Sequence, residues 1–122
     1  MQITQKYLRD NPNHIFVFGD NMLRQGKGGA AALRDEPNTY GFITKLAPSN
    51  APHAYYTPDA YLPVYYAEIE KLKSHIFKNQ KKTFLISKVG AGLANQHKIF
   101  EKVIEPRIKN DLSEFDNVEF LW

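Results

Sequence analysis

The sequence predicts an α/β fold in which helices flank a sheet, and three observations lead to this prediction. Stretches rich in apolar and β-branched residues alternate along the chain with segments of helical spacing. Two glycine-rich loops each come after a predicted strand. Hydrophobic residues make up 43% of the chain and charged residues 24%, as in ordinary globular proteins. With 122 residues, we expect a single domain, residues 1–122, with one core.

The first half of the chain is predicted to contain two strands and a short helix. Residues 1–13 are expected to form a helical or irregular lead-in, and the apolar run Ile15–Phe18 is the first strand. A helix can run only from about Gly29 to Asp35, because Pro37 disfavours helical geometry in the residue before it. Residues with high β-propensity then predict a second strand, Tyr40–Lys45, that ends at the lysine.

The second half is predicted to contain a long loop, two helices and two strands. Leu46–Pro58 has three prolines and few apolar anchors, which predicts a loop that could lie over a site. Apolar residues recur at helical spacing from about residue 60 to 78, so this segment is expected to pack on the sheet as an amphipathic helix. A buried strand follows at Thr83–Val89. Asn95 is expected to cap the next helix, and Val118–Trp122 is the last strand.

The composition argues against several classes of protein. The chain has no cysteine, which excludes disulfides, thiolate metal sites and a cysteine nucleophile, and makes the reducing cytoplasm the expected compartment. Its first residues lack the apolar core of a signal peptide, and no stretch reaches the roughly 18 apolar residues that span a membrane. The four histidines lack the spacing of metal ligands, so we expect neither a metal nor a cofactor. Nothing in the sequence indicates an oligomeric state.

The net charge of +3 mildly favours polyanionic partners. Five lysines gather on the predicted long helix and the turn after it, namely Lys71, Lys73, Lys78, Lys81 and Lys82. Five tyrosines lie after the proline-rich loop, namely Tyr55, Tyr56, Tyr61, Tyr65 and Tyr66. The lysines either form a solvated face or bind nucleic acid by charge. The tyrosines either pack the loop against the helix or stack on a base.

The segment from Phe16 to Leu33 carries the clearest signal for binding. Glycines at the start of a predicted helix let backbone N–H groups approach a ligand, and the helix N-terminus adds partial positive charge, which favours an anion such as phosphate. The alternative is a glycine-rich turn that only makes a tight connection. Gly26–Ala31 formally matches a dinucleotide-binding pattern, but about seven residues separate it from the strand. Lys27 is followed by Gly28 rather than Ser or Thr, so this is not a P-loop.

The second glycine-rich loop, Gly90–Asn95, directly follows a predicted strand. In α/β sheets ligands gather beyond the carboxyl ends of the strands, so we expect the two loops to share a pocket. Lys45, at another strand end, could neutralise a phosphate or, with a lowered pKa, attack a sugar C1 as an amine. The alternative is an exposed lysine. His97 is either an acid or base near the second loop or a surface residue.

The loop Gly26–Ala31, the strand end Ile43-Thr44-Lys45 and the segment Val89–Leu93 together resemble the macrodomain superfamily. The chain looks closest to the branch of ADP-ribose glycohydrolases that release ADP-ribose from acidic side chains or from DNA, and the resemblance spans about residues 14–108. It implies a three-layer, macrodomain-like mixed sheet flanked by helices, with the two loops around the diphosphate and distal ribose of ADP-ribose. It also implies that Lys45 is the catalytic lysine of that branch.

The sequence departs from that branch at two places. The acidic residue that follows G-x-G-L in the family falls on Ala94 here, so Lys45 lacks the expected carboxylate unless Asp20 or His97 replaces it. The upstream strand that carries the family's adenine contact has no counterpart before His14.

We therefore expect a protein that binds ADP-ribose or an ADP-ribosylated macromolecule and can act as a glycohydrolase on modified protein or nucleic acid. Lys45 would attack the sugar C1 or hold charge, Asp20 would act as acid or base, and Asn21 would hydrogen-bond the distal ribose. The other expected ligand-binding residues belong to the two loops and are Gly26, Lys27, Gly28, Gly29, Ala30, Gly90, Ala91, Gly92 and Leu93. The alternatives are a non-catalytic reader of ADP-ribose or a related nucleotide, and a nucleic-acid-binding module.

Overall fold

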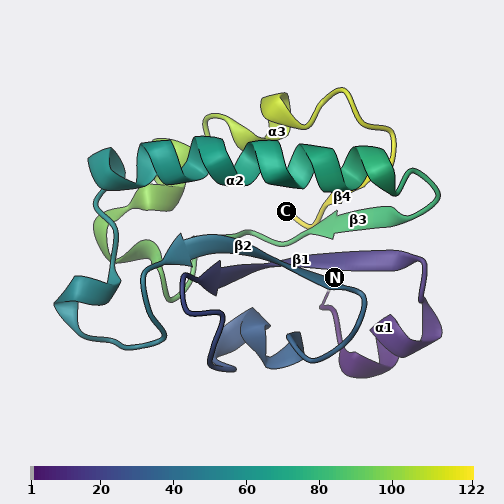
Figure 1. The fold of residues 1–122 in the computed structure, drawn as a ribbon, viewed down its shortest axis with the longest axis horizontal. Coiled ribbons are helices and arrows are strands. Elements are labelled where there is room, and N and C mark those ends of the chain that lie inside the picture. Colours follow the sequence, from purple (N-terminus) through teal and green to yellow (C-terminus); the bar gives the residue numbers. More distant parts are fainter. Residues whose placement is uncertain (1) are drawn as a thin grey trace.

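A parallel sheet forms the middle layer of the molecule, with helices on both of its faces (Figure 1). The computed structural model describes residues 2–122, and its four strands lie in the order β2-β1-β3-β4. The strands are β1 (His14–Asn21), β2 (Thr39–Lys45), β3 (Thr83–Ile86) and β4 (Val118–Phe120). All three pairings between them are parallel. The predicted α/β class is confirmed. The sheet is parallel and not mixed as the resemblance implied, because antiparallel pairing in residues 2–122 is limited to an isolated bridge between Lys45 and Tyr55.

The alternation of side chains along β1 explains the three layers. Successive residues of a strand point to opposite faces of a sheet. Ile15 and Val17 belong to the main core, while Phe16 and Phe18 belong to a smaller core on the other face. The helices are α1 (Gln5–Asp10), α2 (Pro58–Lys78) and α3 (Ile108–Asp111). Figure 1 shows α2 and α3 on one side of the sheet and α1 on the other.

The long helix predicted over residues 60–78 is confirmed as α2. The Thr57 side chain accepts the N–H of Ala60 and so caps the helix, and Pro58 occupies the first turn, where its missing N–H costs nothing. Its buried side chains are spaced to face the sheet, and they include Tyr61, Tyr65, Ile69, Leu72 and Ile76. No helix in residues 2–122 has the length and apolar character needed to cross a bilayer.

A buried carboxylate closes the edge of the sheet at β2. Glu68 Oε1 of α2 accepts the N–H of Ile43 at 2.7 Å, and the hydroxyl of Tyr61 donates to the Ile43 carbonyl oxygen at 2.6 Å. Both backbone groups of this edge residue are thus satisfied by α2, and no further strand can pair with them. Ile43 lies two residues before Lys45, so these two contacts hold the carboxyl end of β2 in place.

The first of the predicted short helices is smaller than expected. A 3-10 helix, η1 (Gly29–Leu33), replaces the helix predicted over Gly29–Asp35. The glycines disfavour helix on one side and Pro37 restricts the chain on the other, so little more than one turn fits between them. A helix this short has no macrodipole of consequence, and the helix-dipole argument for phosphate binding is therefore wrong.

The strand and helix around the second glycine-rich loop are also shorter than predicted. β3 ends at Ile86, where its pairing with β1 stops, and the N–H and the hydroxyl of Ser87 both donate to the carbonyl of Val17. The helix expected after Asn95 is a π-helical segment, η4 (Phe100–Ile104), since Lys98 adopts a left-handed conformation with φ of 64°. The N-cap residue of η4 is Ile99 and not Asn95 as predicted, although the Oδ1 of Asn95 accepts the Phe100 N–H at 3.0 Å.

Candidate functional site

A cleft of about 570 Å³ lies at the carboxyl ends of β1, β2 and β3. The connection from β1 to β2 runs on the α1 side of the sheet, whereas the connection from β3 to β4 runs on the α2 side (Figure 1). The chain therefore leaves the neighbouring strands β1 and β3 in opposite directions, and neither connection covers the gap between their ends. Open α/β sheets bind their ligands at such switch points.

Both glycine-rich loops line this one cleft. The predicted site residues that line it are Asp20, Asn21, Gly26, Lys27, Gly28, Gly29, Ala30, Lys45, Gly90, Gly92 and Leu93. Ala91 does not line it, because this residue packs against the main core and its N–H donates to the carbonyl of Lys88. The loops approach each other closely: a Cβ placed on Gly28 would lie 3.3 Å from the Leu93 Cδ1 atom.

Many backbone N–H groups of the two loops have no acceptor. Within residues 2–122, the N–H groups from Gly26 to Ala30 donate to no protein atom, nor do those of Gly90, Gly92 and Leu93. All of these residues line the cleft. Runs of N–H groups that are not used by the fold, on residues around a shared cavity, make a concave binding site for an anion.

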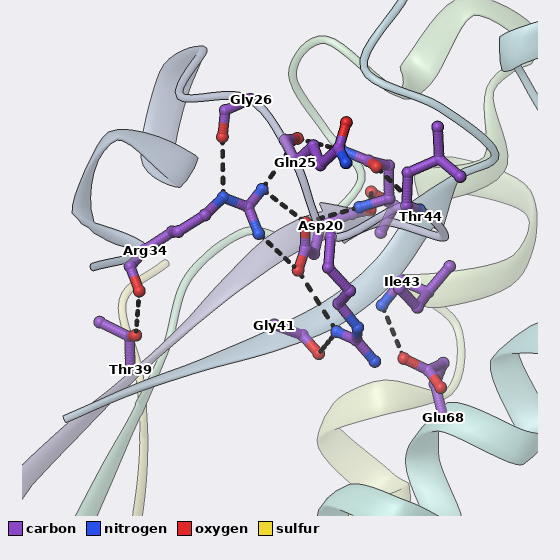
Figure 2. A network of polar contacts seen from close by, with 12 residues as sticks. Asp20, Gln25, Gly26, Arg34, Thr39, Gly41, Ile43, Thr44 and Glu68 are labelled. Carbon is purple, nitrogen blue, oxygen red and sulfur yellow. Dashed lines mark hydrogen bonds and ion pairs between the residues drawn. The ribbon is translucent and has the colours of Figure 1, made fainter. Parts of the chain in front are cut away.

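Arg34 sets the orientation of the first loop (Figure 2). Its guanidinium donates to the carbonyl oxygens of Gly26 at 2.8 Å and Gln25 at 3.1 Å. The C=O and N–H of a trans peptide point in opposite directions, and there is no cis peptide in residues 2–122. The N–H groups of Gly26 and Lys27 therefore point away from Arg34, which does not line the cleft.

Asp20 holds Arg34 in place, an arrangement that does not favour the acid/base role predicted for it. Its carboxylate receives two hydrogen bonds from Arg34, at 2.7 and 3.1 Å, and one from Arg24 at 3.3 Å. The N–H of Asn21 donates to it as well, at 2.8 Å. The Asp20 side chain is 2% exposed, so its lone pairs are used inside the protein and Asp20 is a structural anchor.

The pKa of Asp20 agrees with this structural role. Burial by itself would raise the pKa, but the hydrogen bonds from Arg34, the Asn21 N–H and Arg24, together with the Arg34 charge, outweigh burial and hold the pKa below its ordinary value of 3.8. An aspartate that stays ionised near neutral pH has no proton to give as a general acid.

Asn21 lines the cleft, but its amide builds the turn after β1. Its Nδ2 donates to the carbonyl of Gln25 at 2.7 Å, and its Oδ1 accepts the N–H of Leu23 at 3.0 Å. The predicted hydrogen bond to a ribose would have to compete with these contacts, so we assign Asn21 to the shaping of the loop.

A β-bulge brings Lys45 to the cleft. Asp20 is paired with Ile43 and Asn21 with Lys45, which leaves Thr44 as an extra residue in β2. Bulges of this kind re-aim side chains near functional sites. The Thr44 hydroxyl donates to the Asp20 carbonyl at 3.3 Å and so fixes the bulge.

The environment of Lys45 favours the neutral amine more than that of a surface lysine. The residue is 8% exposed, and this burial disfavours its charged form. Two contacts act the other way and stabilise the charge: the Nζ donates to the carbonyl of Ser49 at 3.0 Å and lies 4.8 Å from the centre of the Tyr55 ring. Within residues 2–122 no carboxylate forms an ion pair with it. Burial therefore lowers the pKa of Lys45 from its ordinary value of 10.5.

The cleft has an excess of positive charge. Its ionisable lining side chains are three lysines, Lys27, Lys45 and Lys88, and one carboxylate, Asp20, which two arginines neutralise. Lys27 is paired with the exposed Asp35 at 2.5 Å, and the Nζ of Lys88 lies 5.1 Å from the centre of the Phe100 ring. His97 is exposed and is not part of the lining, so the structure does not support it as a substitute for the missing acid.

The lysines of α2 and the buried tyrosines near it do not line the cleft. Tyr56, Tyr61 and Tyr65 are buried in the main core, so for them the packing interpretation holds. Lys71 and Lys73 each lie within ion-pair distance of a glutamate, at 3.6 Å and 3.7 Å.

Sequence reasoning missed Arg34 and Lys88. Arg34 is 14 residues from Asp20, and no spacing rule connects the two. Lys88 could have been predicted as a site residue. It lies near the end of a predicted strand and just before a glycine-rich loop, and Lys45 is predicted because it also lies at a strand end.

Comparison of the chain with curated proteins and with solved structures found no match. A family model matches residues 1–103, which include the three strands, both loops and every residue that lines the cleft. The chain therefore belongs to DUF7831, a family of unknown function.

Proposed function

We propose that the cleft binds a nucleoside-diphosphate sugar such as ADP-ribose, free or attached to a macromolecule, through its pyrophosphate. The observation that carries this proposal is the convergence of two runs of unused backbone N–H groups on one cleft with surplus positive charge. A pyrophosphate offers oxygens on two phosphorus atoms, so each loop can donate to one phosphate while lysines balance the charge.

The loops leave room for such close contact. No heavy atom lies within 4 Å of the position that a Cβ on Gly92 would take, so the backbone there is open to a ligand. Gly26, with φ of 89°, lies against the long loop after β2, since a Cβ there would be 3.0 Å from Pro48 Cβ. The resemblance to macrodomains supports ADP-ribose as the nucleotide of choice.

The environment of Lys45 favours glycohydrolase activity as a second function of the same cleft. The lone pair of the neutral Nζ would form a bond to the sugar C1, and the bond from C1 to the leaving oxygen would break with its electron pair on that oxygen. A proton would pass from the nitrogen to water. Water would then cleave the C1–N bond, which frees the sugar and restores Lys45.

Calorimetric titration tests the binding proposal. We expect ADP-ribose and inorganic pyrophosphate to bind, and both to bind less tightly to Gly92→Ala and Lys88→Met. Lys71→Met, on α2, is the matched control for loss of one lysine charge and should bind like the wild type. Failure of both ligands to bind the wild type would overturn the proposal.

Turnover is tested by incubation with ADP-ribosylated protein or DNA and measurement of free ADP-ribose. Release that is lost in Lys45→Ala supports the glycohydrolase, and its rate should rise with pH as the lysine loses its proton. Binding without release supports a reader. Affinity for oligonucleotides that falls steeply with salt and is unaffected by ADP-ribose would instead support the nucleic-acid-binding alternative.

A further inference from the structure

A second groove of about 520 Å³ continues from the cleft on the α1 side of the sheet. The two cavities share walls: Gly29 and Ala30 of the first loop on one side, and Ser87 and Lys88 after β3 on the other. A ligand that holds a phosphate in the cleft can therefore extend into this side groove without leaving the protein surface.

The side groove differs in chemistry from the cleft. Its walls include the apolar side chains Ile3, Phe16, Leu33 and Leu121, and Lys88, at the junction with the cleft, is its one ionisable lining residue within residues 2–122. Ile3 and Phe16 are 9% and 5% exposed, so they are packed in the smaller core and form the bottom of the groove. A flat, uncharged, apolar group gains the most free energy from such a surface.

The N-terminal segment adds polar groups to this groove. Within residues 2–122 the backbone N–H and C=O of Ile3 hydrogen-bond to nothing, although its side chain belongs to the smaller core. An N–H beside a C=O matches the edge of a purine, where a ring nitrogen acceptor lies next to an amino donor. Gln2 and Thr4, on either side, also line the groove.

We propose that the side groove holds the purine base of the nucleotide whose pyrophosphate lies in the cleft. This inference rests on the proposed function. The shared walls place the base and the phosphates next to each other, and Lys88, which lines both cavities, lies at the junction where a phosphate would meet the nucleoside. The groove would supply a base site that the sequence alone does not reveal, because Ile3, Phe16 and Leu121 come from the two ends of the chain.

A variant that fills the groove tests this inference. Ala32 is exposed, lines the side groove and does not line the cleft. We expect Ala32→Trp to weaken the binding of ADP-ribose at least about tenfold, from the lost burial of the base, and to leave the binding of pyrophosphate unchanged. Ala67→Trp, an exposed alanine on α2, is the matched control and should change neither affinity.

The outcomes separate the two proposals. If neither ligand binds the wild type, the proposed function fails. If pyrophosphate binds the wild type and ADP-ribose binds no more tightly, or if Ala32→Trp leaves ADP-ribose binding unchanged, the base site is wrong while the pyrophosphate site stands.

An NMR titration of the wild type tests the base site without any variant that could misfold. The amide signals of Ile3, Thr4 and Leu121 should shift with ADP-ribose and remain in place with pyrophosphate. Shifts that are the same for both ligands would overturn the inference.

Discussion

The two glycine-rich loops present N–H groups to the same cleft, but they are held in place by opposite means. The first loop depends on polar contacts, because Arg34 fixes its carbonyl groups and Asp20 fixes Arg34. The second depends on packing. Gly90 has φ of 82°, and a Cβ there would come within 2.5 Å of the buried Ile104 Cδ1 atom.

This difference follows from where each loop lies. The first loop is exposed from residue 22 to residue 30, so it has no apolar core against which to pack. A charged anchor reaches it from Asp20, at the buried end of β1. The second loop leads into η4, which places Phe100, Val103 and Ile104 in the main core, and there only a glycine lets the backbone approach. We therefore expect the first loop to be sensitive to charge and pH and the second to be sensitive to side-chain volume.

Loss of the charged anchor should have the largest effect. Asp20→Asn leaves two arginines without their carboxylate, one of them only 15% exposed, so we expect the free energy of unfolding to fall by about 3 kcal/mol. Urea unfolding measures the change. Asp35→Asn, which removes the exposed partner of Lys27, is the matched control and should change stability little. Equal effects of the two substitutions would show that Asp20 is not the anchor.

A methyl group in the second loop should have the next largest effect. Gly90→Ala combines a positive φ with a clash against Ile104, and we expect a loss of about 2 kcal/mol in the free energy of unfolding. The second substitution Ile104→Val, made in the Gly90→Ala background, should relieve the clash, and the two changes should be non-additive. Additive losses would mean that the two side chains do not compete for the same space.

Acid should remove the stabilisation of the first loop by Asp20, whereas the packing of Gly90 near Ile104 in the second loop involves no titrating group. The pKa of Asp20 is held below 3.8 in the folded protein, so its contribution to stability is complete above that value and is lost as the pH falls through the folded pKa. The difference in urea midpoint between the wild type and Asp20→Asn should therefore be constant near neutral pH and shrink in acid. A difference that does not change with pH would contradict this assignment.

The smallest effect on stability is expected at Gly92, in the same loop as Gly90. Its φ is not positive and its Cβ position is empty, so Gly92→Ala should stay within about 1 kcal/mol of the wild type. Ligand affinity should nevertheless fall, because the methyl group lies on the cleft. A marked loss of stability would show that the second loop is packed at more points than Gly90.

Sequence patterns were sufficient for the scaffold of the site. Strand-forming residues up to Lys45 and the helical spacing after residue 60 place β2 and α2 correctly, and the parallel sheet brings both loops to its carboxyl edge. These features depend on local propensity and on the period of apolar residues, which a single sequence contains.

The roles of single polar residues could not be predicted in this way. Asp20 looks like a catalytic carboxylate until its two arginine partners are known, and the fold alone brings Arg34 to it. The interrupted η4 also differs from the pattern, because the left-handed Lys98 and the contact of Asn95 with Phe100 override local helical spacing.

The most direct test of the central claim is an NMR titration of the wild type with inorganic pyrophosphate. If the two loops bind one anion through their unused N–H groups, the amide signals of Gly26–Gly28 and of Gly90, Gly92 and Leu93 should shift together, with a single dissociation constant. Shifts in only one loop, or only on the lysine-bearing face of α2, would contradict the claim.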